Sequence, residues 1–143
     1  MSRISALELQ YTDLEWYAID RKGNVAVFLS AGEGNVPEFV CEEKERTEAL
    51  IEFFENAERN GFPVICGAYV TGAVDMAREM AARGVYCYDA VSGQRHYKRL
   101  ACPELPLALE ILPERIRNIL VVNQLDVDDF SQEELIRVPH AYE

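Results

Sequence analysis

Two stretches of the chain have the residue types of a ligand site. The loop Gly32-Glu33-Gly34 could approach a phosphate closely, but a Walker loop needs a lysine and a hydroxyl after its last glycine, and a dinucleotide loop needs a third glycine. The run Asp126-Val127-Asp128-Asp129 offers oxygen ligands for calcium. An EF-hand beginning at Asp126 would place Phe130 at a ligand position and Arg137 at the position of the bidentate glutamate. We therefore expect neither a nucleotide cofactor nor a bound metal ion.

The two histidines, His96 and His140, are the side chains best suited to acid–base catalysis near neutral pH. Neither stands in a sequence context that would activate it. His96 belongs to a basic cluster, Arg95-His96-Tyr97-Lys98-Arg99, in which Tyr97 could stack on a nucleic-acid base. On a strand, alternate residues of this cluster would face opposite sides, so that they would not form one basic surface.

An aromatic-lined pocket is the alternative site. Trp16, Tyr86 and Tyr88 could line a cavity beside His96, as in a small-molecule-binding or enzymatic domain. Large aromatic side chains are more often part of a hydrophobic core. A concave apolar pocket with convergent polar groups would favour this alternative, whereas a convex acidic surface would favour a protein-binding domain.

Charge separates the classes of partner more clearly. The 143 residues include 25 acidic and 14 basic side chains, and the formal net charge is −11. Such a field repels nucleic-acid phosphates and anionic membranes and attracts basic proteins, although exposed acids are also a common source of solubility. We expect a basic protein as the partner, and neither nucleic acid nor a membrane. The residues predicted to contact it are acids of one helix and one loop: Glu45, Glu48, Glu52, Glu55, Asp126, Asp128 and Asp129.

Two β-hairpins are predicted where runs of β-forming residues flank turn residues. The first joins residues 16–19 to 25–30 through a turn that contains Gly23-Asn24. The second joins residues 85–90 to 95–101 through Ser92-Gly93. Both faces of residues 25–29 are apolar, which predicts a central strand covered on both sides.

Two main helices are predicted, at about 41–60 and 71–83. The first has an apolar stripe at helical spacing, and Gly61 and Pro63 are typical of its end. The fold class that follows is α+β: one domain over residues 1–143, with a mostly antiparallel sheet built from two hairpins and two main helices.

The cysteines and the apolar runs bear on the compartment. Cys41, Cys66, Cys87 and Cys102 are widely spaced and form no Cys-x-x-Cys pair. No apolar run reaches the roughly 18 residues of a membrane span, and residues 1–13 carry charges where a secretory signal would be apolar. We therefore expect a cytoplasmic protein whose reduced thiols serve as small core residues.

Residues 16–37 carry a resemblance. The run Trp16-Tyr17-Ala18-Ile19-Asp20, followed by Gly23-Asn24, Ala26-Val27-Phe28, Gly32, Gly34 and Pro37, resembles the opening of small acidic bacterial immunity-type proteins of polymorphic toxin systems. The resemblance implies a non-enzymatic protein that binds and blocks a toxin domain. Nuclease toxins need basic surfaces, so an acidic inhibitor would be steered onto them quickly.

Overall fold

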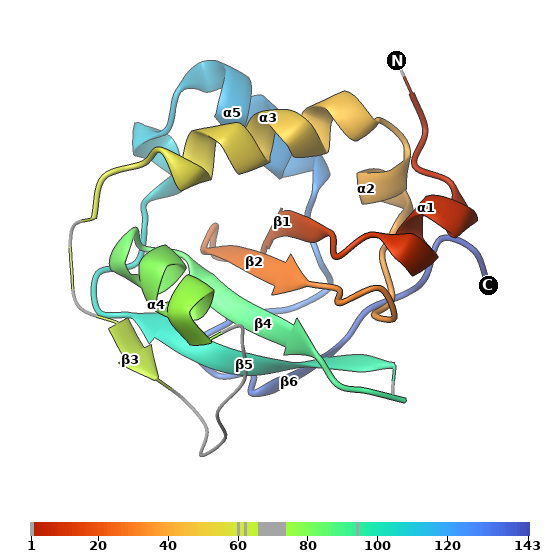
Figure 1. Cartoon of the computed structure of the whole chain (residues 1–143). Coiled ribbons are helices and arrows are strands. Elements are labelled where there is room, and N and C mark those ends of the chain that lie inside the picture. The colour runs from red at the N-terminus through yellow and green to blue at the C-terminus, as the bar shows by residue number, and fades with distance from the viewer. Residues whose placement is uncertain (1, 60, 62, 66–73, 94) are drawn as a thin grey trace.

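The structure, a computed structural model, describes residues 2–59, 61, 63–65, 74–93 and 95–143 (Figure 1). Its helices and strands follow one another as α1 (Ala6–Tyr11), β1 (Glu15–Ile19), β2 (Val25–Leu29), α2 (Glu38–Cys41), α3 (Lys44–Glu55), β3 (Pro63–Ile65), α4 (Val74–Ala82), β4 (Tyr86–Ala90), β5 (His96–Pro103), a 3₁₀ turn η1 (Leu109–Ile111), α5 (Glu114–Val122) and β6 (Leu135–Arg137). The fold is α+β, as the sequence predicts. Figure 1 shows α3 and α5 side by side over β1 and β2, with α4 over β4 and β5.

All six strands belong to one mixed sheet. Its order is β1-β2-β4-β5, and the free edge of β5 pairs with β6 along His96–Lys98 and with β3 along Ala101–Pro103, so that the sheet is five positions wide. The pair β2–β4 is parallel and the other pairs are antiparallel. The prediction of a mostly antiparallel sheet built from two hairpins, with two main helices, is therefore too small: it lacks two strands, the parallel pair and the additional helices. The hairpins β1–β2 and β4–β5 are joined in parallel and extended by two further strands, and the described chain forms five α-helices.

The side chain of Asp20 stabilises the turn of the first hairpin. Its carboxylate accepts hydrogen bonds from the backbone N–H groups of Lys22 (3.0 Å) and Asn24 (2.9 Å), while Gly23 adopts a positive φ of 82° that favours glycine. Beyond the turn every residue of β2 is buried. This confirms the prediction of a central strand covered on both sides.

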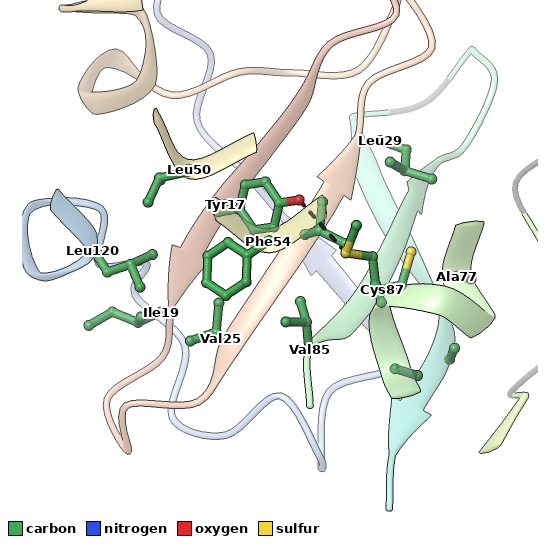
Figure 2. Packing of buried hydrophobic residues seen from close by; sticks show 14 of the residues in the cluster. Tyr17, Ile19, Val25, Leu29, Leu50, Phe54, Ala77, Val85, Cys87 and Leu120 are labelled. Atoms are coloured by element: carbon green, nitrogen blue, oxygen red, sulfur yellow. Dashed lines mark hydrogen bonds between the residues drawn. The ribbon is translucent and has the colours of Figure 1, made fainter. Parts of the chain in front are cut away.

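Alternation along the strands creates two hydrophobic cores, one on each face of the sheet. Tyr17 and Val27 face the helices α3, α4 and α5, and the ring of Tyr17 stacks on Phe54 with centroids 4.7 Å apart (Figure 2). Trp16 and Phe28 face the opposite side, where their rings stack at 4.2 Å. That second core is closed by α2 and by residues 125–138 of the C-terminal segment.

The predicted helix at 41–60 corresponds to α3, which begins only at Lys44, while Cys41 is the last residue of the short helix α2. The break falls at Glu43, whose backbone is extended (φ −149°), and there the N-terminal segment passes: the backbone N–H of Lys44 donates to the carbonyl of Ser2 at 2.6 Å. The helix α3 ends at Glu55 rather than near residue 60, because the guanidinium of Arg83 binds the carbonyls of Glu55 and Ala57.

The second predicted helix corresponds to α4. It ends at Ala82, and the predicted start at Thr71 lies outside the described residues, as does Cys66. The other three cysteines are free thiols, of which Cys41 and Cys87 are buried and Cys102 is half-buried. Burial raises the pKa of the Cys41 thiol to about 11, which keeps it protonated and unreactive.

Candidate functional site

The helix α3 carries a single stripe of exposed carboxylates, which we call the acidic stripe: Glu45, Glu48, Glu52 and Glu55. Their spacing of three, four and three residues places them along one side of the helix. Leu50 and Phe54 on another side are fully buried against the sheet. Because a helix rises about 1.5 Å per residue, the acidic stripe runs for about 15 Å.

Within the described part of the chain the carboxylates of the acidic stripe have no ion-pair partner, although the ammonium group of Lys44 lies near Glu45 and Glu48. Glu45 accepts a hydrogen bond from the backbone N–H of Ser2 at 2.7 Å. The two cations at the start of α3 are engaged elsewhere: Lys44 pairs with Glu8 at 2.5 Å and Arg46 with Glu42 at 3.0 Å. The sequence-predicted acids of α3 are thus brought together, and their field is directed outward.

The other predicted acids lie elsewhere. Asp126 and Asp128 form ion pairs with Arg21 in the turn of the first hairpin, and Asp129 pairs with Lys22 at 3.0 Å. The loop precedes Phe130, which packs in the second core, so it belongs to the face of the sheet opposite α3. Asp129 is also only 13% exposed. The structure therefore does not bring these aspartates together with the acidic stripe, and two basic side chains, Arg21 and Lys22, offset part of their charge.

The carboxyl group of Glu15 lies near that of Glu55, at the C-terminal end of the acidic stripe. The hydroxyl of Tyr17 donates to Oε2 of Glu15 at 2.7 Å, and it also contacts the sulfur of Met80 at 3.7 Å (dashed in Figure 2). Burial raises the pKa of the Glu15 carboxyl to about 7, the bond from Tyr17 opposes this, and the charge of Glu55 adds to it. Glu15 is thus only partly ionised near neutral pH, and its titration changes the negative charge at this end of the acidic stripe. No sequence pattern marks Glu15, because its pKa depends on packing between β1 and α3.

Between α1 and α3 the surface is hollowed into a cavity of about 290 Å³, which we call the α1–α3 groove. Its walls are mostly apolar and include Ile4, Leu9, Leu14, Thr12, Thr47 and Ile51, and its rim carries Glu8, Lys44 and Glu48. Glu48 belongs to both the groove and the acidic stripe. The sequence analysis missed α1, although Ser5 and Glu8 have the spacing of a capping box, and both hydrogen bonds of that box are present.

The aromatic residues of the alternative site are core side chains. Trp16, Tyr86 and Tyr88 are at most 4% exposed, and the ring of Tyr88 stacks on Phe28 at 5.1 Å. His96 is half-buried on β5, where it pairs in register with Arg137 of β6. These rings stabilise the second core rather than line an opening to solvent.

The glycine-rich loop and the basic cluster are also bound into the fold. The hydroxyl of Tyr97 is buried beneath the loop and donates to the carbonyl of Asn35 at 2.7 Å. Arg99 donates to the carbonyl of Phe130 at 2.6 Å, and Arg95 forms an ion pair with Glu143. His140 accepts a hydrogen bond at Nδ1 from the backbone N–H of Val36. These interactions account for both segments structurally.

The chain matches no protein-family model, and no curated protein or solved structure is significantly similar to it. Within the described ranges, no helix combines the length and apolar composition that crossing a bilayer requires. In the same ranges, no three histidine, cysteine, aspartate or glutamate side chains are grouped so that they could hold a metal ion.

Proposed function

We propose that this chain is a protein-binding domain that captures a basic protein on α3. The observation that carries the proposal is the acidic stripe: four exposed carboxylates on one side of one helix, without an ion pair among the described residues. Charges arranged in this way accelerate the encounter with a basic surface and orient it. The aspartates at 126, 128 and 129 contribute less, because Arg21 and Lys22 offset two of their three charges.

In its most concrete form, the partner is the basic surface of a toxin or nuclease domain, and the chain is an immunity-like inhibitor. The support for this form is the resemblance of residues 16–37 together with the net charge of −11. An inhibitor of this kind needs no catalytic group. It needs a rigid charged surface, and α3 is held rigidly by Leu50 and Phe54 in the first core.

The test measures inhibition of nuclease activity. A panel of purified bacterial nuclease domains with high isoelectric points is assayed at low and at high salt, with and without the full chain. We expect the chain to inhibit at least one of them, with inhibition weakening as salt rises. The triple variant E48K/E52K/E55K should lose that inhibition.

The matched control reverses three exposed glutamates outside α3, as E33K/E104K/E134K, which changes the net charge by the same amount. If both triple variants lose inhibition equally, overall charge rather than the acidic stripe governs binding. If neither loses it, α3 is not the binding surface.

A further inference from the structure

The α1–α3 groove adds an apolar contact to the edge of the acidic stripe. Ile4 and Leu9 form its buried floor, and the half-buried side chains of Leu14 and Ile51 form apolar walls. The helix α1 is held beside α3 by the ion pair between Glu8 and Lys44, and the segment before α1 is held there by the hydrogen bond from the backbone N–H of Lys44 to the carbonyl of Ser2 at 2.6 Å. The groove is therefore preformed.

The size and chemistry of the groove select one kind of occupant. Its volume of about 290 Å³ lies at the lower end of the roughly 300–1,000 Å³ of small-molecule sites and is large enough for one apolar side chain used as an interface anchor. On the rim, Glu8 and Lys44 neutralise each other, whereas Glu48 forms no ion pair among the residues described. The rim thus has a net negative charge contributed by Glu48.

We propose that the α1–α3 groove holds a large apolar side chain of the basic partner that stands next to a lysine or arginine, and that this cation pairs with Glu48. The inference rests on the proposed function and names the part of the partner that would be gripped. Anchors of this type dominate binding energy when they fill a pocket at the centre of a contact. The exposed Leu7 (64%) and Tyr11 (83%) on α1 would extend the apolar contact beyond the groove.

Charge complementarity favours this occupant over two others. An anionic lipid surface would meet the acidic stripe with charge of the same sign. A second copy of this chain could insert Leu7 or Tyr11, but it also has a net charge of −11 and would be repelled.

The test uses three capped tripeptides as probes: acetyl-Lys-Leu-Lys-amide, acetyl-Glu-Leu-Glu-amide and acetyl-Lys-Ser-Lys-amide. Each is titrated into the isotope-labelled full chain while the methyl resonances of Ile4, Leu9, Leu14 and Ile51 are followed. We expect the Lys-Leu-Lys probe to shift these resonances and to bind about tenfold more tightly than either control. Equal binding of all three probes, or no shift at these methyl groups, would overturn the proposal.

Two variants locate the contact. Thr12 is exposed at the mouth of the groove, so T12W should fill the groove and abolish the methyl shifts, whereas N118W on the exposed side of α5 should not. E48Q should bind Lys-Leu-Lys and Glu-Leu-Glu with nearly equal affinity while it keeps the fold. Retention of the preference in E48Q would contradict the pairing with Glu48.

The outcomes remain distinguishable from those of the nuclease assay. Glu52 and Glu55 lie on the acidic stripe but not in the groove, so E52K/E55K should weaken nuclease inhibition and leave the leucine contact intact. Failure of the proposed function would appear as absent inhibition of every basic domain, whatever the tripeptides do. Methyl shifts that grow with protein concentration alone, together with a doubled mass in sedimentation, would show a second copy in the groove and overturn the basic partner.

Discussion

Oδ2 of Asp20 accepts a hydrogen bond from the backbone N–H of Phe130 at 2.8 Å, which joins the turn of the first hairpin to the C-terminal segment. The same carboxylate accepts two backbone bonds within its turn and a third bond from the side-chain amide of Asn24 at 2.9 Å. Asp20 is 1% exposed, so its buried charge depends on these donors for compensation. Phe130 in turn packs its ring against Phe28 and Tyr88. The buried carboxylate of Asp20 therefore holds Phe130 in place in the second core.

Replacing Asp20 by asparagine should destabilise the fold markedly. The amide cannot accept at both positions, so N–H groups of the turn or of Phe130 lose their partner, at a cost of about 2–4 kcal/mol. Urea unfolding followed by tryptophan fluorescence measures this, since Trp16 lies in the same core. As the comparison, D128N removes an exposed charge that pairs with Arg21, and its effect should be small. Equal destabilisation by both variants would contradict the role of Asp20.

The local parts of the fold follow from the sequence, and the long-range parts do not. The first hairpin is readable because its turn and its alternation are determined by neighbouring residues. The parallel pairing of β2 with β4 depends on the packing of α3 against β1 and of α4 against β4 and β5, which no local pattern expresses. The break before α3 is likewise invisible in a run of helix-forming glutamates, because it arises where Ser2 meets Lys44.

The candidate site shows the same division. Helical periodicity suffices to place Glu45, Glu48, Glu52 and Glu55 on one exposed side of α3. The separation of the acidic loop from α3 could not be foreseen, because it depends on the face of the sheet along which residues 125–138 return. The α1–α3 groove could not be predicted from the sequence for a related reason, because it forms only where α1 packs beside α3.

Position 34 requires glycine because the ring of Tyr97 leaves no room for a side chain, not because of its backbone angle. A Cβ atom at this position would lie 2.5 Å from the hydroxyl oxygen and 2.8 Å from Cζ of Tyr97, whose ring is buried and held by Asn35. G34A should therefore cost about 1–3 kcal/mol in the free energy of unfolding, as overpacking does.

The matched change is G61A, where the nearest atom to an added Cβ is 3.5 Å away. Its effect should stay within about 1 kcal/mol, because the loss of chain entropy in the unfolded state offsets small strain. Thermal unfolding of both variants checks the difference, and similar melting temperatures would rule out a steric role for Gly34.

Arg83 ends α3 from outside the helix. Its guanidinium donates to the carbonyls of Ala57 (2.9 Å), Glu79 (3.1 Å) and Glu55 (3.3 Å), and only 11% of its side chain is exposed. R83M should leave these carbonyls without their partner, lower the stability by about 1–3 kcal/mol and increase amide hydrogen exchange near the end of α3. R78M removes an exposed arginine of α4, the helix that ends just before Arg83, and should not change exchange near the end of α3. Unaltered exchange in R83M would refute this capping role.

Stability should fall as the pH rises from about 4.5 to 7, and Glu15 should be a cause. Burial raises the pKa of Glu15 from 4.5 to about 7 in the folded protein, so within this window the folded state holds a proton that the unfolded state has lost. The contribution is full below 4.5 and is lost as the pH passes 7. Because the carboxyl is partly exposed, we expect about 1–2 kcal/mol.

Comparing urea midpoints of the wild type, E15Q and E52Q across this pH range isolates the effect of Glu15. E15Q should flatten the profile, because the amide keeps the bond to Tyr17 without titrating. E52Q removes a fully accessible carboxylate of α3 and should leave the slope unchanged. In E55Q the pH range over which stability falls should end at a lower pH, because loss of the Glu55 charge lowers the pKa of Glu15. A slope that persists in E15Q would mean that another group releases the proton, and the link between this end of the acidic stripe and pH would be lost.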